Sequence, residues 1–372
     1  MTPNGKFAEA MKRHLATWAS ELDGFRSDGV HSWVLHPSVG ALNCFGRQEW
    51  FALVADKLHQ WGHALNSSQA FAVNLFGPAR FSQAAAQALW KELPAGRSHR
   101  DPHHVDVHFE YSGPEDGFTR QTLGEAGIPT QIDVAVEGSF TQGVRRLQLI
   151  EVKFTESHFG AYRGAKGGKG QANPAPERCG NLAKVLEDKA EQCWLVQAEH
   201  RRYWDLIEGS PGLKVSADEQ GGCPWRGGLY QLMRNWALAH SLLERNIAAS
   251  VDLAVCIHPD NDEARRLHTK VAGSEDALVA FNGMTAPTKV AELDPRVLVR
   301  AQDVGGAPAG WRGYIVPDRK MPKFLTRQRF FAAAKARSWR KMRGNRPATA
   351  SLRVISVDGV TCWTSLLRLR LA

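Results

Sequence analysis

The chain carries the stretch Leu147-Gln-Leu-Ile-Glu-Val-Lys-Phe154, in which two charged side chains stand inside an apolar run. Successive side chains of a strand point to opposite faces, so Leu149, Glu151 and Lys153 share one face. Burying charged groups in such a segment costs free energy unless they are paired or bind a metal. The segment therefore predicts a strand whose Glu151 and Lys153 point the same way for a functional reason.

A second strand is predicted over residues 131–136, Gln-Ile-Asp-Val-Ala-Val. The polar residues 137–146 between the two apolar segments favour an antiparallel hairpin, and this pairing brings Asp133 beside Glu151. Two carboxylates are oxygen ligands for a hard cation such as Mg²⁺, and an amine beside them can act on a phosphate or an attacking water. These three groups together are typical of phosphodiester hydrolysis.

The same residues resemble a known family. Asp133, preceded by Pro129, and Glu151-x-Lys153 are similar to the signature of the PD-(D/E)xK nuclease superfamily. Three longer segments are similar to a restriction-endonuclease-like branch of it: residues 65–78, 149–156 and 227–235. The resemblance implies an Mg²⁺-dependent nuclease, with Mn²⁺ as a substitute, in which Asp133 and Glu151 bind the metal. Lys153 would orient or deprotonate the attacking water, or offset developing negative charge.

We therefore expect an enzyme that cuts DNA, in defence against foreign DNA or in repair. Two alternatives stay open: a catalytically inactive DNA-binding protein of the same fold, and an RNA-processing nuclease, because phosphodiester chemistry does not reveal the sugar. Charges on a strand can also form a solvated face of an antiparallel sheet. Leu147 and Leu149 on the same face favour burial instead. A homodimer is compatible with the sequence.

The pattern along the chain predicts the element order α-β-β-β-α-β. Helical periodicity covers residues 47–76 and ends at Gly77-Pro78, and alternation predicts a strand over residues 105–111 before the two described above. Later elements are expected as helices near residues 180–208 and 227–245 and a buried strand over residues 250–257. This order is the one that the resemblance implies: an α/β, restriction-endonuclease-like core with a mixed sheet flanked by helices.

We expect three regions: an N-terminal extension over residues 1–44, the nuclease-like domain over residues 45–260, and a basic C-terminal region over residues 261–372. Residues 296–372 hold 17 Lys and Arg against 3 Asp and Glu, although the whole chain carries only +9. Basic segments bind phosphates through counterion release. We assign Arg337, Arg340 and Lys341 to nucleic-acid contact, and a partly disordered basic arm without a specific role is the alternative.

A glycine-rich segment over residues 160–170 follows the motif. It lacks the Gly-Lys-Ser/Thr ending of a nucleotide-binding P-loop, which argues against ATP binding there. We expect either a mobile basic flap over DNA, with Arg163, Lys166 and Lys169 as its contacts, or an inert surface loop.

Three further residues are accessory expectations. Glu110 lies in the strand before the motif and would hold a second metal, unless it is a surface residue. Gln231 resembles a glutamine that some exonuclease branches place near the metal. Gln69 falls in a helical segment, where amides usually cap or face solvent.

The six cysteines include no Cys-x-x-Cys pair, and disulfides are not expected. Some relatives of this fold bind an iron–sulfur cluster, and Cys179, Cys193 and Cys223 would supply three ligands, with Cys256 or a histidine as the fourth. Buried core thiols are the alternative.

No run of about 18 uncharged apolar residues occurs, so no membrane span is expected. The N-terminal residues lack the apolar core of a secretory signal. We expect a cytoplasmic protein.

Overall fold

The computed structural model describes the following residues: 6–45, 47–57, 59, 62–97, 101–160, 162, 164, 173–208, 223–271, 273–285, 289–302 and, for the backbone alone, 351–357 and 360–366. The chain divides into two compact units, residues 1–316 and residues 317–372. Each unit is described by itself.

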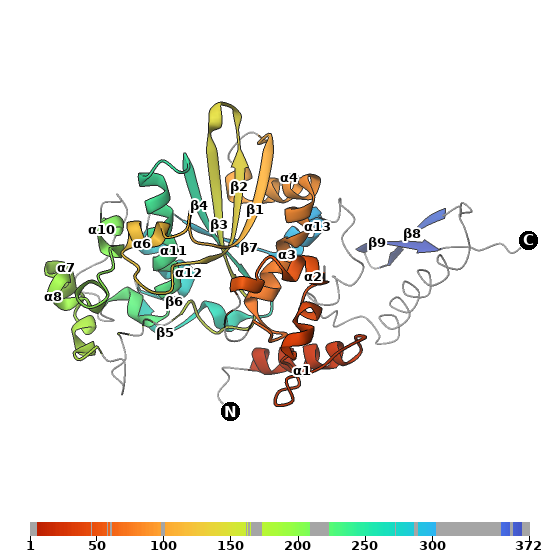
Figure 1. The fold of residues 1–372 in the computed structure, drawn as a ribbon, viewed down its shortest axis with the longest axis horizontal. Coiled ribbons are helices and arrows are strands. Elements are labelled where there is room, and N and C mark those ends of the chain that lie inside the picture. Colours follow the sequence, from red (N-terminus) through yellow and green to blue (C-terminus); the bar gives the residue numbers. More distant parts are fainter. Residues whose placement is uncertain are drawn as a thin grey trace, which may run out of the picture. The chain divides into compact units, whose positions relative to one another are not determined.

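The first unit is built around a mixed sheet of five strands in the order β1-β2-β3-β4-β7 (Figure 1). Its strands are β1 (His104–Tyr111), β2 (Ile132–Ser139), β3 (Arg145–Lys153), β4 (Ser250–Ile257) and β7 (Val290–Leu293). The first three strands pair antiparallel, whereas β3, β4 and β7 run parallel. The expected mixed α/β core is confirmed, and the sheet itself runs past residue 260 because β7 pairs with β4.

The two faces of the sheet pack against different helices. Ile150 and Val152 of β3 belong to a core that includes Phe71 and Phe76 of α3 (Ser68–Phe81). Leu147 and Leu149 belong to a second core that includes Trp236 of α11 (Tyr230–Glu244). Because β3 has a strand on each side and a core on each face, all its residues from Leu147 to Lys153 are buried. Figure 1 shows the strands between α3 and α4 on one side and α11 and α12 on the other.

Further helices complete the first unit. They are α1 (Lys6–Ser20), α2 (Arg47–Phe51), α4 (Gln83–Glu92), α5 (Pro94–Arg97), α6 (Phe118–Leu123), α7 (Leu182–Glu187), α8 (Lys189–Gln192), α9 (Trp194–Gln197), α10 (Tyr203–Glu208), α12 (Ala277–Met284) and α13 (Pro295–Gln302). Short 3-10 helices cover Pro37–Asn43, Ala55–Lys57, Thr141–Gly143, Pro176–Gly180, Pro224–Gly227 and Asp262–Arg265, and a small separate sheet pairs β5 (Arg266–Val271) with β6 (Ser274–Asp276). None of the described helices is both long and apolar enough to cross a membrane.

The helix expected over residues 47–76 is not continuous. α2 ends at Phe51, and α3 begins anew at Ser68, where the Ser67 side chain accepts a hydrogen bond from the Ala70 N–H. Such N-caps start helices because they satisfy a backbone donor that has no partner within the helix. α3 then continues through Pro78 to Phe81. Phe71, Val73, Leu75 and Phe76 are fully buried, and this packing outweighs the hydrogen bond that proline cannot donate.

The expected helical region over residues 180–208 consists of four short helices, α7 to α10. Asn181 caps α7 through the Lys184 N–H, and Asp188 caps α8 through the Glu191 N–H. Capping residues at these spacings restart the helix instead of extending it. The region therefore folds as a compact set of turns beside α11.

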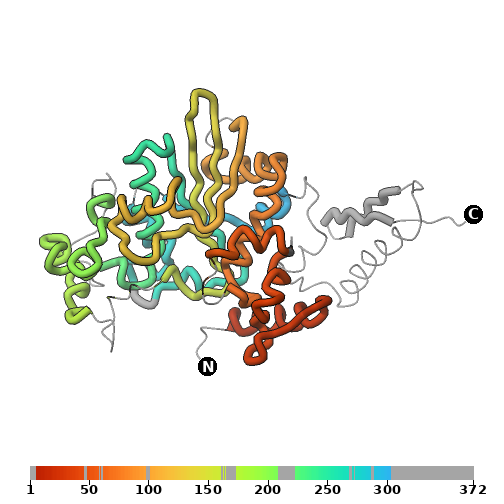
Figure 2. The backbone as a smooth tube through the Cα atoms, in the orientation of Figure 1, coloured from red at the N-terminus to blue at the C-terminus, as the bar shows by residue number. Residues whose placement is uncertain are grey.

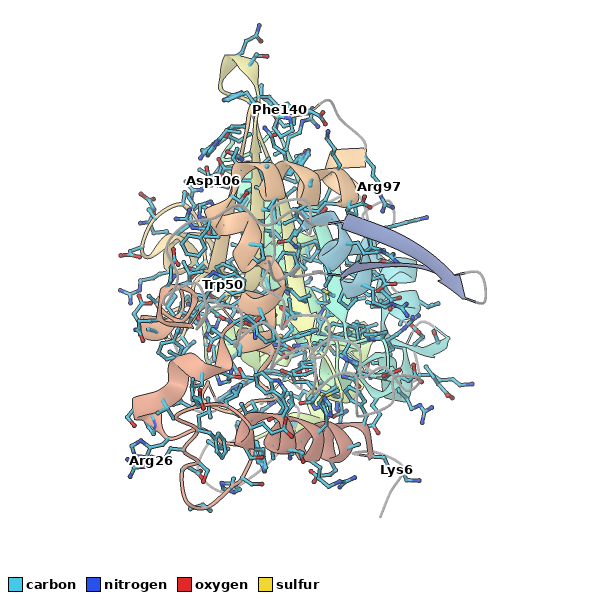
Figure 3. The ribbon with its side chains drawn as sticks, turned by 90° about the vertical axis from the view of Figure 1, so that its right-hand side faces the viewer. Lys6, Arg26, Trp50, Arg97, Asp106 and Phe140 are labelled. Atoms are coloured by element: carbon cyan, nitrogen blue, oxygen red, sulfur yellow. The ribbon has the colours of Figure 1, made fainter. Side chains whose placement is uncertain are left out.

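The hairpin of β2 and β3 marks one end of the sheet. Figure 2 shows it projecting beyond the neighbouring strands, and Figure 3 places Phe140 near its tip and Lys6 at the opposite end of the unit. Asp133 stands at the start of β2 and Lys153 at the end of β3, so both lie away from the hairpin tip. Of the second unit, the structure describes an antiparallel hairpin of β8 (Ser351–Val357) and β9 (Val360–Leu366).

Candidate active site

Three acidic residues occupy neighbouring positions across three strands. Phe109 pairs with Val134, and Val134 pairs with Ile150. The next positions in this register are Glu110, Asp133 and Glu151, which therefore follow one another across β1, β2 and β3. Directly opposed residues of antiparallel strands share a face, so the hairpin brings Asp133 and Glu151 to the same side of the sheet.

Glu151 is a buried carboxylate that is held at both of its oxygens. The Lys153 ammonium donates to Oε1 at 2.7 Å, and the Asn235 side-chain amide of α11 donates to Oε2 at 2.8 Å. Glu151 is 3% exposed and Lys153 is 4% exposed, so this ion pair lies almost entirely out of water. Each carboxylate oxygen keeps a second lone pair, which leaves Glu151 able to accept a further ligand.

Asp133 is oriented by the backbone of the neighbouring strand. The Val152 N–H donates to its Oδ2 at 2.6 Å. Removal from water raises the pKa of Asp133 well above its ordinary value, and the charges of Glu151 and Glu110 raise it further, while Lys153 and the Val152 N–H lower it. The surroundings of Asp133 therefore disfavour its ionised form.

Lys153 carries a stabilised positive charge. Burial lowers the pKa of its ammonium, but the charges of Glu151, Glu156 and Asp133 together outweigh burial and raise the pKa above its ordinary value. The ammonium also lies 5.8 Å from the centroid of the Phe159 ring. Lys153 therefore stays protonated at neutral pH.

The structure brings Glu110 and Gln69 to the same place. Gln69 is buried, and its side-chain N–H group donates to Glu110 Oε1 at 2.9 Å and to the Lys57 carbonyl at 3.0 Å. Glu110 has a backbone φ of 50°, in the left-handed region that non-glycine residues seldom adopt. Burial raises the pKa of Glu110 to about 7, with the Gln69 hydrogen bond lowering it and the Glu151 charge raising it.

The Glu156 carboxylate holds the backbone just after β3 through hydrogen bonds. Glu156 Oε2 accepts hydrogen bonds from the Phe154 N–H at 3.0 Å and the Thr155 N–H at 3.1 Å, and Ser68 of α3 donates to its other oxygen. The Asn261 side chain, after β4, donates to the carbonyls of Phe154 and Glu156 at 2.9 Å each. These bonds join the start of α3 and the ends of β3 and β4 at one edge of the sheet.

A cavity of about 760 Å³ opens beside Lys153. Its walls come from the segment after β3, from the turn before α10 and from the first turns of α11, and the lining residues are Ile128, Lys153, Glu156, Ser157, His158, Gly160, Tyr162, Glu199, Arg201, Tyr230, Gln231 and Arg234. Gln231 lines this cavity together with Lys153. The Gln231 backbone N–H donates to the Phe159 carbonyl at 2.8 Å.

Asn235, Ser68, Asn261 and Arg234 are contributors that the sequence reasoning missed. Asn235 belongs to the segment that resembles the nuclease branch, and it stands one turn after Gln231 on the same helix face. That spacing is the signal that could have found it.

The described residues contain no group of three His, Cys, Asp or Glu side chains that could hold a metal by themselves. Mg²⁺ does not need such a group, because proteins usually bind it through one or two carboxylates while waters and substrate phosphates complete the shell. Burial is the main cause that raises the pKa values of Asp133 and Glu110, and the nearby Glu151 charge raises both further; a bound cation would stabilise their ionised forms. The donor set of Asp133 and Glu151 thus fits a hard divalent cation.

Cys179, Cys193 and Cys223 lie in the core under α11, and Cys256 belongs to the core on the other face. The Cys223 N–H donates to the Cys179 carbonyl at 2.8 Å, and the Trp204 indole N–H donates to Cys193 Sγ at 3.3 Å. Burial, with the neighbouring Cys193 thiol, raises the pKa of Cys179 to about 11. The described part of the chain thus gathers three thiols without Cys256 as the fourth, and the iron–sulfur cluster stays a prediction.

All six expected nucleic-acid contacts lie outside the described residues: Arg163, Lys166, Lys169, Arg337, Arg340 and Lys341. Their assignment stays a prediction.

Comparison with known proteins gives one family. No curated protein and no solved structure matches the chain. The model of the family described as Restriction Endonuclease associating with ARP matches residues 52–316, which is more than half of the 372 residues. The matched range contains the sheet, the acidic residues of its three strands, and α11. The chain therefore belongs to the family of restriction endonucleases associating with ARP.

Proposed function

We propose that the protein is a metal-dependent nuclease of the PD-(D/E)xK type that hydrolyses phosphodiester bonds in DNA, with a role in defence against foreign DNA or in repair. The family is one of restriction endonucleases, which supports nuclease activity. The observation that carries the proposal is the Glu151 carboxylate, held at both oxygens by Lys153 and Asn235 and placed opposite Asp133 at the end of a central strand.

Asp133 and Glu151 are the residues that would hold Mg²⁺ or Mn²⁺. The bound cation would lower the pKa of a water molecule and offset the negative charge that develops on the phosphate. The protein's own part is to fix the two carboxylates: Val152 orients Asp133, and Lys153 and Asn235 orient Glu151. Glu110, held by Gln69, adds a third negative group at the same edge.

The raised pKa of Lys153 favours one of the roles open to it. A protonated ammonium cannot remove a proton from water, which favours charge stabilisation over general-base action for Lys153. It offers hydrogen bonds and positive charge to a phosphate oxygen, in a site from which water is largely excluded. Its position at both the ion pair and the cavity matches this role.

The test incubates the purified full chain with circular and linear DNA and with RNA, in Mg²⁺ or in EDTA. The wild type should cut DNA only with the cation, and Asp133→Asn should cut nothing. Asp106→Asn is the matched control, because Asp106 lies half-exposed on β1 of the same sheet, where its register partner is Glu137 and its side chain pairs with His104. Cleavage of RNA alone would replace the DNA assignment with RNA processing, and binding without any cleavage would favour an inactive DNA-binding protein.

A further inference from the structure

One of the cationic side chains of the cavity beside Lys153 forms no ion pair with a described acidic residue. Three cationic side chains line it: Lys153, Arg201 and Arg234. Lys153 is paired with Glu151 at 2.7 Å, and Arg201 lies 3.2 Å from Glu199 and 3.6 Å from Glu125. Arg234 has no carboxylate within ion-pair distance among the residues that the structure describes.

The acidic residues of the cavity wall are already engaged. Glu199 faces Arg201, and Glu156 accepts hydrogen bonds from Ser68 and from the backbone after β3. Neither is available to offset Arg234. The cavity therefore presents an anion-binding guanidinium close to the group that would act on the cleaved phosphate.

Arg234 is held in a fixed orientation. Its Nε donates to Thr130 Oγ1 and its Nη2 to the Pro129 carbonyl, at 3.0 Å each, and its guanidinium lies 5.6 Å from the centroid of the Tyr230 ring. A guanidinium has five N–H donors, so three remain for a ligand. Such a preset guanidinium loses little side-chain entropy when it binds an anion.

A second observation points to a ligand. Tyr162 also lines the cavity, and it is 3% exposed, yet its hydroxyl has no hydrogen-bond partner among the described residues. A buried polar group without a partner costs free energy, which a ligand whose polar atom reaches this hydroxyl would recover. Tyr162 and Tyr230 stand with their ring centroids 5.7 Å apart, so the cavity also has an aromatic wall.

The volume limits what can enter. About 760 Å³ falls within the ~300–1,000 Å³ typical of pockets that enclose one small ligand. This volume is large enough for one unpaired nucleotide. Enzymes that act on nucleic acids take unpaired nucleotides into such pockets, from single strands or by extrusion from a duplex, and hold them against aromatic walls.

We propose that this cavity binds an unpaired nucleotide next to the cleaved bond, with its phosphate on Arg234 and its base or sugar at Tyr162 and Tyr230. The inference rests on the proposed nuclease function and narrows it to nucleic acids with single-stranded or unpaired positions. The chain would then distinguish substrates by the pairing state of a nucleotide beside the scissile phosphate.

The test measures fluorescence anisotropy of one labelled DNA strand in EDTA, so that nothing is cut. The strand is offered free, fully paired, or paired with one unpaired nucleotide. The full-length wild type should bind the free and bulged forms more tightly than the fully paired one. Tyr162→Phe should weaken binding of these two forms by roughly 3- to 10-fold, and Arg234→Gln by roughly 10- to 100-fold, with the paired form unaffected by Tyr162→Phe.

Tyr162→Phe keeps the test decisive if Arg234→Gln folds poorly. It removes only a hydroxyl without a described partner, so its melting temperature should equal or exceed that of the wild type. Arg202→Gln is the matched control, because Arg202 is an exposed arginine that pairs with Asp205 and does not line the cavity. Equal affinity for the three forms, or wild-type affinity in Tyr162→Phe, overturns the inference.

A parallel assay with Mg²⁺ separates the two proposals. If the wild type cuts DNA but Tyr162→Phe behaves as the wild type, the nuclease function stands and the nucleotide site fails. If no form is cut but the binding pattern holds, the nucleotide site stands and the nuclease function fails.

Discussion

The carboxylates of Glu151 and Glu125 are both buried beside α11. Two consecutive residues of that helix form the hydrogen bonds that link it to them. Asn235 donates to Glu151, whereas Arg234 donates to Thr130, which in turn donates to Glu125. Glu151 is 3% and Glu125 is 1% exposed, so taking each from water carries a similar cost. Their neighbours differ, and that difference separates a reactive site from a structural one.

Glu125 is surrounded by donors alone. Thr130 donates to it through both its N–H and its hydroxyl, Tyr203 donates its hydroxyl, and Arg201 lies 3.6 Å away. Glu151, in contrast, shares its surroundings with Asp133 and Glu110, whose pKa values are raised. Glu125 thus has only hydrogen-bond donors and an arginine around it, whereas Glu151 has two further carboxyl groups nearby. The comparison teaches that burial alone does not identify the reactive acid.

The largest effect on DNA cleavage is expected at Asp133, beside Glu151 and Glu110. Asp133→Asn should lower DNA cleavage by at least ~10³-fold, because Asp133 would hold the metal ion, and a metal ion that offsets transition-state charge contributes several kcal/mol. The same change should leave the melting temperature in EDTA unchanged or raise it, since the native fold disfavours this charge. Cleavage rates and thermal unfolding of the same preparation check both halves.

Glu125→Ala should show the opposite profile. It leaves Tyr203 and Thr130 without their acceptor and removes one of the two carboxylates beside Arg201, and breaking such a buried network costs about 3 kcal/mol of unfolding free energy. Cleavage per folded molecule should fall much less than in Asp133→Asn, because Glu125 does not contact the acidic row and acts only on Thr130, which anchors Arg234, and on Arg201. Denaturant unfolding measures the loss. A variant with wild-type stability and no cleavage would reverse the roles of the two acids.

Asn235→Ala tests how Glu151 is positioned. Losing a hydrogen bond to a charged acceptor costs about 1.5–3 kcal/mol, so cleavage should fall by roughly 10- to 100-fold. Because Glu151 would be less well oriented, the Mg²⁺ concentration for half-maximal activity should rise. Asn282→Ala is the matched control, since Asn282 bonds to the Val290 backbone and only supports β7. An unchanged Mg²⁺ dependence would mean that Asn235 has a structural role only.

The smallest effect concerns pH. Burial raises the pKa of Glu110 from 4.5 to about 7, so between these values the folded protein binds more protons than the unfolded chain. Stability in EDTA should therefore fall as pH rises through this window, by about 1–3 kcal/mol, and stay at the lower value above it. Glu110→Gln should flatten this dependence. A pH series of urea unfolding curves provides the measurement, and identical slopes for both proteins would contradict the assignment.

The strands that carry the acids could be read from the sequence, because alternation and charge in residues 131–136 and 147–154 leave one consistent pairing. The helix residues that form hydrogen bonds with these and other buried acids could not be predicted from the sequence. Asn235 lies 84 positions from Glu151, and an amide in an amphipathic helix looks the same whether it faces water or a carboxylate. Glu125 stands in a polar stretch with glycines, which is typical of an exposed turn, and Tyr203 that buries it is 78 positions away.

The short strand β7 and the break before α3 were not predicted from the sequence for another reason. β7 has four residues, too few to show a period, and it is a strand because β4 offers a parallel edge beside it. The break before α3 depends on the Ser67 cap, whereas the helical periodicity continues across it. Tertiary contacts thus decided what local pattern left open.

Glu151 and Lys153 are carried by the central strand of the sheet, which is hydrogen-bonded on both sides and covered on both faces. Amide hydrogens of such a strand exchange with solvent deuterium only when the unit unfolds globally, while ends and surface loops exchange by local opening. Deuterium uptake at β3 would therefore track the unfolding free energy of the whole unit. The two side chains of the candidate site share the most strongly hydrogen-bonded part of the backbone. In the proposed nuclease, adjustment on binding would therefore come from the nucleic acid and the surrounding loops.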